Sequence, residues 1–195
     1  ATKLASDKMF VASNAYSGEH KTQFSVVRYG NVMGSRGSVI PFFMQEKNNG
    51  VLPITDNRMT RFMITLEEGV NLVWKAFDDM CGGEIYVKKI PSMKVTDLAA
   101  AIDKDAIQKV IGIRPGEKLH EEMIGEDDSL YTYEYDDYYK ILPAINNWSF
   151  SKKLIKSGKR VEKNFSYTSD NNREWMSIET LQKWIKNNEN KIGKI

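Results

Sequence analysis

The sequence predicts an α/β protein, in which a core over residues 1–90 is followed by a smaller α+β lobe over residues 91–195. Two observations support this fold class. Short runs of β-branched and other apolar residues alternate along the chain with segments whose apolar residues recur at helical spacing, as is typical of α/β folds. After Pro91 the elements become shorter and less regular, which favours a separate lobe.

Helices are predicted where apolar residues recur every three or four positions next to a start or stop signal. Pro41 in a first turn, the Thr65–Glu68 capping box and the double glycine at Gly82 are such signals. In order, the predicted helices cover residues 1–16, 39–48, 66–80, 95–102, 118–124 and 175–192. The first is expected to be amphipathic, with an apolar stripe that includes Leu4 and Met9. In the last, four residues are expected to face inward: Ile178, Leu181, Trp184 and Ile185.

Strands are predicted where β-branched and aromatic residues cluster between turn residues. In order, these strands are a buried one over 24–29, a short one over 51–55, and further ones over 84–90, 110–113 and 130–142. The acidic, tyrosine-rich segment 130–142 suits an exposed or edge strand. Residues 30–38 form a glycine-rich loop, Arg114–Glu117 a turn, and residues 146–172 a polar loop.

Composition excludes several functional classes. Apolar residues make up 41% of the 195 residues and charged residues 28%, which indicates a folded globular protein. No apolar run is long enough to cross a bilayer. The net charge is only +2, and its small basic excess in the last fifty residues lacks the dense basic face that is typical of nucleic-acid binding. The single Cys81 fits a reducing cytoplasm. His20 and His120 are not spaced as metal ligands, and His120 is expected to be solvated on a helix surface, so no metal is predicted.

Two arginines and a glutamate in turns are the residues most suggestive of ligand binding. Arg61 and Arg114 offer planar, bidentate donors suited to phosphate or to a uracil carbonyl. Glu117 could accept both hydroxyls of a ribose, or it could simply pair with Arg114 and lock the turn; the residues alone favour neither reading. Arg36, in the Gly34–Ser38 loop, could meet a phosphate, but an ordinary turn explains that loop equally well.

Several motifs then occur in an order that a known family shares. They run from Phe24 to Phe43, from Pro53 to Phe62 and from Ile111 to Glu121. These segments resemble the soluble, inverting UDP-N-acetylglucosamine 4,6-dehydratases of pseudaminic acid biosynthesis, which are extended short-chain dehydrogenases/reductases. The resemblance spans nearly the whole chain. His120 stands where related membrane-bound, retaining dehydratases usually carry tyrosine, which favours the inverting branch.

The resemblance implies that residues 1–90 complete a Rossmann-like core and that residues 91–195 form a UDP-sugar-binding lobe. It also implies an NADP-dependent reaction. A hydride leaves sugar C4, water is eliminated across C5–C6, the hydride returns to C6, and C5 is inverted. A cytoplasmic homo-oligomer is expected.

The family's Tyr-x-x-x-Lys motif would place its lysine at Lys3 and its tyrosine before Ala1. The resemblance therefore implies that Lys3 is catalytic and binds the nicotinamide ribose, and that Val32 passes near the nicotinamide. The substrate-binding residues that it implies are Asn31, Arg36, Thr55, Met59, Arg61, Arg114 and Glu117.

The family's tyrosine and dinucleotide fingerprint do not occur in these residues. We therefore expect this polypeptide to be inactive alone and to need the N-terminal half of the same enzyme as its partner. Two alternatives stay open, a non-catalytic UDP-sugar-binding fragment and a retaining-type dehydratase.

Overall fold

The computed structural model describes residues 2–18, 22–144 and 152–193, and it confirms the mixed α/β fold class. The chain forms two compact units that interleave along the sequence. Unit 1 contains residues 1–29, 68–89 and 123–166, and unit 2 contains residues 30–67, 90–122 and 167–195. The division into a core over 1–90 and a lobe over 91–195 stays a prediction.

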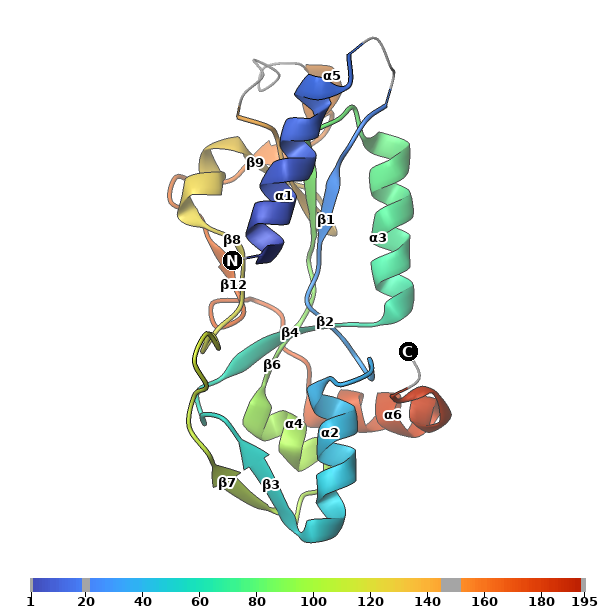
Figure 1. The fold of residues 1–195 in the computed structure, drawn as a ribbon, viewed down its shortest axis with the longest axis vertical. Helices are drawn as coiled ribbons and strands as arrows, with labels where there is room; N and C mark the ends of the chain where they lie inside the picture. The colour runs from blue at the N-terminus through green and yellow to red at the C-terminus, as the bar shows by residue number, and fades with distance from the viewer. Residues whose placement is uncertain (1, 19–21, 145–151, 194–195) are drawn as a thin grey trace. The chain divides into compact units, whose positions relative to one another are not determined.

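Unit 1 is built on a mixed five-stranded sheet (Figure 1). The strand order is β1 (Val26–Arg28), β5 (Ile85–Lys88), β10 (Tyr138–Ile141), β9 (Thr132–Glu134) and β11 (Lys159–Arg160). β1 and β5 are parallel, with Val27 opposite Tyr86, and the other neighbours are antiparallel. A parallel pair needs a crossover, and α3 (Leu66–Asp79) leads directly into β5. In Figure 1, α3 and α1 (Thr2–Ser13) lie on either side of β1.

Arg28 ties three parts of unit 1 together. Its Nε donates to Asp7 of α1 at 2.8 Å, and its Nη1 donates to the Met123 carbonyl at 2.8 Å and to Asp128 at 3.2 Å. The arginine is mostly buried, so these charge-assisted hydrogen bonds are shielded from water. They fix α1 to the end of β1 although many of the helix's apolar side chains are exposed.

A buried lysine lies inside unit 1. The Lys140 side chain is 2% exposed, and its Nζ donates to Asp79 at 2.6 Å and to the Leu154 carbonyl at 2.8 Å. Asp79 also accepts hydrogen bonds from Tyr86 and Lys156. Burial would raise the pKa of Asp79, but the hydrogen bonds from Lys140, Lys156 and Tyr86 outweigh it and lower the pKa from 3.8 to about 2.

Unit 2 contains two small sheets and three longer helices. β2 (Asn31–Val32) pairs in parallel with β4 (Thr60–Ile64), which pairs antiparallel with β6 (Ser92–Lys94). β3 (Val51–Ile54) pairs in parallel with β7 (Ile107–Val110). The helix α4 (Val95–Ile102) packs on α2 (Val39–Glu46) and on α6 (Ile178–Asn188). Their shared core includes Phe43, Leu52, Met63, Leu98 and Leu181.

The remaining elements are short. They are the 3-10 turns η1 (Asn14–Tyr16), η2 (Lys47–Asn49), η3 (Glu126–Tyr131) and η5 (Glu189–Lys191), the helix α5 (Lys152–Ile155), and the strands β8 (Glu122–Ile124) and β12 (Tyr167–Thr168). Among the described residues, no helix is both long and apolar enough to cross a membrane.

The structure confirms five of the six predicted helices and corrects several other elements. The sixth, over 118–124, was wrong: this segment is extended and ends in β8, because its polar groups bond to β4 and to Ser169. The strand predicted over 110–113 lies earlier, at β7. The segment 130–142 was predicted to be exposed, but it forms β9 and β10, whose residues are mostly buried. β2, β4 and β6 were not predicted.

The apolar stripe predicted for the first helix is exposed. Leu4 is 56% and Met9 71% exposed, so α1 does not bury this face against the described residues. The last helix behaves as predicted, since Leu181 is fully buried and Ile178, Trp184 and Ile185 pack against the unit 2 core. Its first turn is capped by Ser177, whose Oγ accepts the Thr180 N–H at 3.1 Å.

The Lys140–Asp79 pair generates a prediction about stability. Replacing Lys140 by Met leaves a mostly buried carboxylate without its principal cation, so we expect a loss on the order of 3 kcal/mol in the free energy of unfolding. The matched control is Lys75→Met, which removes the half-exposed pair with Asp137 and should cost less than about 1 kcal/mol. Urea unfolding measures both, and equal losses would contradict the analysis.

The lowered pKa of Asp79 generates a second prediction. A folded-state pKa near 2, below the ordinary 3.8, means that the unfolded chain binds the proton more readily. The resulting stability is fully present above the unfolded-state pKa and is lost as the pH falls through about 2. As the pH falls from 3.8 to about 2, we expect the free energy of unfolding to fall less steeply in Asp79→Asn than in the wild type. Parallel slopes in the two proteins would show that other carboxylates are responsible.

Candidate functional site

Unit 2 contains a cavity of about 410 Å³, a size usual for small-molecule sites. One wall is apolar and includes Phe42, Phe43, Pro53 and Met59. Polar and charged side chains also line it: Asn31, Ser38, Thr55, Arg61, Arg114 and Glu117. The ionised groups of this lining are two arginines and one glutamate, which leaves one net positive charge facing the cavity.

The Arg-Pro-Gly-Glu turn carries two of these charges. Pro115 supplies the fixed φ of the second turn position, and Gly116 has φ of +82°, which the third position of a type II turn requires. The turn is closed by a 3.0 Å hydrogen bond from the Glu117 N–H to the Arg114 carbonyl. The Glu117 carboxylate in turn accepts the Arg114 N–H at 3.2 Å. The sequence therefore dictates a rigid turn that holds Arg114 and Glu117 at the cavity.

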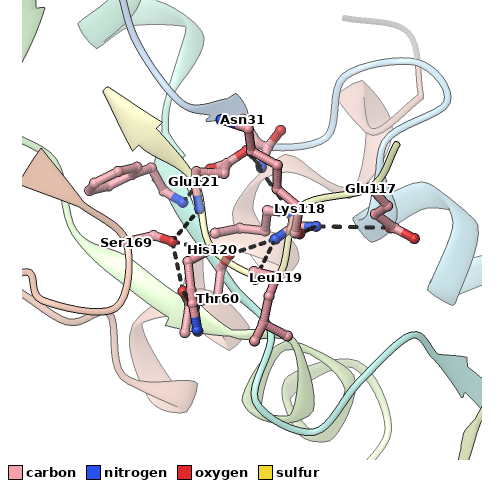
Figure 2. Close-up of polar contacts among 10 residues, drawn as sticks. Asn31, Thr60, Glu117, Lys118, Leu119, His120, Glu121 and Ser169 are labelled. Carbon is pink, nitrogen blue, oxygen red and sulfur yellow. Dashed lines mark hydrogen bonds and ion pairs between the residues drawn. The ribbon is translucent and has the colours of Figure 1, made fainter. Parts of the chain in front are cut away.

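Arg61 is anchored to the main chain beside this turn. Its Nη1 donates to the Thr60 carbonyl at 2.7 Å and to the Leu119 carbonyl at 3.1 Å, and its Nη2 donates to the Lys118 carbonyl at 3.0 Å (Figure 2). Three of the five N–H hydrogens of a guanidinium are used in this way. The side chain is only 16% exposed. Arg61 is thus a fixed cation with part of its donor capacity left.

Glu117 lies between the two arginines. Its carboxylate oxygens are 3.9 Å from Arg61 Nη2 and 3.7 Å from Arg114 Nε. Both distances exceed a hydrogen bond, so the carboxylate attracts both cations without taking up their N–H groups. The Arg114–Glu117 pair that could merely lock the turn is present, but both side chains also face the cavity.

Asn31 lies on β2 and lines the cavity. In the pairing of β2 with β4, Asn31 is opposite Met63. The preceding residue must be glycine, because a Cβ at Gly30 would lie 2.4 Å from the Cβ of Phe62. The Asn31 Nδ2 donates to Glu121 Oε1 at 3.2 Å, and the other oxygen of Glu121 accepts the Phe62 N–H at 2.8 Å. Figure 2 shows these contacts.

His120 belongs to a hydroxyl network rather than to a solvated helix surface, and that prediction was wrong. Its Nδ1 is 2.8 Å from Thr60 Oγ1, which is 2.6 Å from Ser169 Oγ (Figure 2). The Asp170 carboxylate is 4.0 Å from His120 Nε2. A hydrogen bond from Thr168 keeps the pKa of Asp170 below its usual value. Thr60 belongs to β4 and is only 3% exposed, so its hydrogen bonds are shielded from water. This network therefore holds the segment 118–121 against β4.

Ser38 stands just before α2 and also faces the cavity. Its Oγ is buried, and it makes no hydrogen bond within the part of the chain that the structure describes. The residue occupies the N-cap position of α2 but does not cap it. A buried hydroxyl without a partner is costly, so this atom is free to bind a polar ligand group beside the positive end of the helix.

The structure brings together six of the seven residues predicted for the substrate site. All six line the cavity: Asn31, Thr55, Met59, Arg61, Arg114 and Glu117. Arg36 is exposed in the turn after β2 and is not part of this lining. Val32 is half-buried in β2, and Lys3 is exposed on α1 in unit 1. Their predicted roles toward a cofactor stay predictions.

Sequence reasoning missed Ser38, Glu121 and Ser169. Ser38 carried one usable signal, because a serine just before a helix that begins Val39-Ile40-Pro41 is a candidate cap. Glu121 and Ser169 carried none, since their roles depend on contacts with β4, a strand that the sequence did not predict.

Comparison with known proteins identifies one matching family and several similar proteins. A family model described as "Polysaccharide biosynthesis protein" matches residues 1–143. Two proteins of Campylobacter jejuni described as "UDP-N-acetylglucosamine 4,6-dehydratase (inverting)" are each 53% identical. The match to the serotype O:2 protein covers 97% of this chain and 59% of that protein, and the match to the serotype O:23/36 protein covers 93% and 56%.

More distant relatives match over similar lengths. A UDP-glucose 4-epimerase of Rickettsia canadensis is 36% identical over 88% of this chain and 52% of its own length. Among solved structures, the X-ray structure of Pen from Bacillus thuringiensis is 34% identical and superposes with a TM-score of 0.80. That match covers 96% of this chain and 56% of the other. The chain therefore spans a little over half the length of the relatives it matches.

Proposed function

The chain belongs to the polysaccharide biosynthesis protein family. Because it is also 53% identical to two inverting dehydratases, we propose that it forms the nucleotide-sugar-binding part of an enzyme that converts UDP-N-acetylglucosamine to a UDP-4-keto-6-deoxy sugar and inverts C5. The observation that carries this proposal is a cavity in unit 2 in which Arg61, Glu117 and Arg114 lie beside an apolar wall. A nucleotide sugar has the matching parts, namely an anionic diphosphate, hydroxyl groups and a flat base.

Each part of the cavity suits one part of this ligand. The remaining N–H groups of Arg61 and those of Arg114 suit diphosphate oxygens, and the free Ser38 hydroxyl at the start of α2 can add a further hydrogen bond. The Glu117 carboxylate accepts hydrogen bonds and therefore suits the two ribose hydroxyls. The apolar surface of Phe42, Pro53 and Met59 suits the base or the carbon face of the sugar.

We further propose NADP as the cofactor, which would supply the acceptor and later the donor of the transferred hydride. Of the residues that the resemblance assigns to this group, Lys3 has suitable chemistry. Lys3 is exposed, and within the described residues its ammonium makes no hydrogen bond or ion pair, so its three donors can hold a ribose hydroxyl. Val32 follows Asn31 in β2, and its carbonyl already accepts the Ser35 N–H at 3.2 Å. Homo-oligomer formation, cytoplasmic location, a role in pseudaminic acid biosynthesis and inactivity of these residues alone remain predictions from the resemblance.

The proposed reaction predicts a specific product. The complete gene product, incubated with UDP-N-acetylglucosamine and NADP, should form a UDP-4-keto-6-deoxy sugar, which proton NMR identifies by its C6 methyl group and the C5 configuration. An unchanged C5 would support the retaining alternative. Binding without turnover would support the non-catalytic alternative.

Arg114 provides the matching test of binding. Arg114→Ala should weaken UDP binding by roughly ten- to hundredfold, because hydrogen bonds to a charged group each contribute about 1.5–3 kcal/mol. The matched control is Arg58→Ala, since Arg58 is equally exposed but pairs with Asp56 and is not part of the cavity lining. Isothermal titration calorimetry measures both variants, and an equal loss would contradict the assignment.

Ser38 gives a prediction in which stability and affinity separate. Ser38→Ala removes a buried hydroxyl without a partner, so the melting temperature should stay the same or rise. UDP affinity should nevertheless fall about fivefold, as expected for one lost hydrogen bond. Thermal unfolding and titration of the same sample test this, and a stability loss without an affinity loss would assign Ser38 a purely structural role.

A further inference from the structure

Glu121 contacts the cavity lining without belonging to it. Its Oε1 accepts the Asn31 Nδ2–H at 3.2 Å, and its Oε2 accepts the Phe62 main-chain N–H at 2.8 Å (Figure 2). Its own main-chain N–H donates to Ser169 Oγ at 2.9 Å. The carboxylate is therefore held from both sides while one of its oxygens touches a residue that lines the cavity.

This arrangement sets the direction of the Asn31 carboxamide. An ionised carboxylate only accepts hydrogen bonds, and a carboxamide donates only through its nitrogen. The Asn31 nitrogen must therefore face Glu121, and the carbonyl oxygen Oδ1 must point elsewhere. The Phe62 N–H cannot turn away, because it belongs to β4, so the carboxylate itself is fixed in place.

We propose that Glu121 is a positioning residue that turns the Asn31 carboxamide so that Oδ1 is the atom offered to a bound ligand. An oxygen acceptor selects a hydroxyl or N–H group and repels a phosphate oxygen. Asn31 therefore recognises the sugar of a nucleotide sugar, whereas the arginines bind its diphosphate. The inference rests on the proposed function and refines the expected role of Asn31 in substrate binding.

Neutralising Glu121 should affect diphosphate binding and sugar binding in different ways, because its charge acts on Arg61 and its position acts on Asn31. The Glu121 Oε1 atom also lies 4.0 Å from Arg61 Nε. Neutralising Glu121 removes a negative charge beside that cation, which should leave diphosphate binding unchanged or make it tighter. It also lets the Asn31 carboxamide turn over, which should weaken sugar binding. A role limited to stability would instead weaken both.

The test compares UDP with UDP-N-acetylglucosamine in the complete gene product. Glu121→Gln keeps the side chain's shape but presents an amide nitrogen to one of its two donors. We expect the dissociation constant for UDP-N-acetylglucosamine to rise about tenfold, the effect of misplacing a hydrogen-bond partner, while that for UDP stays within about twofold. Glu122→Gln is the matched control, because Glu122 is the next residue along the chain and its side chain is exposed. This variant should change neither dissociation constant.

A second variant swaps the two groups. In Asn31→Asp combined with Glu121→Gln, the amide nitrogen of residue 121 faces a carboxylate at residue 31, and an oxygen again points into the cavity. The preference for UDP-N-acetylglucosamine over UDP should return. A tenfold loss for both ligands in Glu121→Gln, or a swap that does not restore the preference, would overturn the proposal.

A ligand-free measurement separates this inference from the proposed function. The Asn31 side-chain amide resonances of the wild type should be shifted by the carboxylate hydrogen bond, and Glu121→Gln should abolish that shift while Glu122→Gln leaves it in place. Failure of the wild type to bind either ligand would reject the proposed function alone. Unchanged Asn31 resonances in Glu121→Gln would reject the positioning role, whatever the protein binds.

Discussion

The anchoring of Arg61 to three main-chain carbonyls is the interaction on which the rest of the cavity depends. Residues 112–121 have no regular secondary structure, so no helix or strand ladder of their own holds them in place. Arg61 connects them to β4 through the Lys118 and Leu119 carbonyls, and the Thr60 N–H also donates to the Leu119 carbonyl at 3.2 Å. The turn that carries Arg114 and Glu117 is thus positioned by a neighbouring strand. A cation that serves as a structural anchor and lines the cavity fixes its own position before any ligand arrives.

The elements that could be predicted from sequence are those whose signals are local. Helical spacing identified α2, α3, α4 and α6, because each has apolar residues that recur along one face. β2, β4 and β6 were missed because they are two to five residues long and are stabilised by pairing with one another, which no local pattern reports. The helix predicted over 118–124 was wrong for a related reason. Its composition permits a helix, but hydrogen bonds from Thr60, Phe62 and Ser169 hold it extended.

The same distinction holds for the cavity. The Arg-Pro-Gly-Glu turn could be predicted from the sequence, because Pro115 and Gly116 determine its type. The turn places Arg114 and Glu117 on the same side of the main chain, at the cavity. Arg61 was grouped with them because an arginine suits the same ligand, but the resemblance, and not the spacing, favoured a shared binding role, since 53 positions separate Arg61 from Arg114. The Asn31–Glu121 contact and the free Ser38 hydroxyl depend on tertiary positions alone. The charged residues of the cavity lining were therefore more predictable than the residues that orient them.

In the proposed site, the two arginines meet different costs on binding an anion. Arg61 is mostly buried and already held by three hydrogen bonds, so it loses little conformational freedom when a ligand arrives. Arg114 is 72% exposed, and ordering its long side chain costs about 0.5–1.5 kcal/mol. Glu117 reduces that cost, because it attracts Arg114 toward the cavity from 3.7 Å without using its N–H groups. One carboxylate thus holds two like charges near each other in the free protein and leaves their donors available to the ligand.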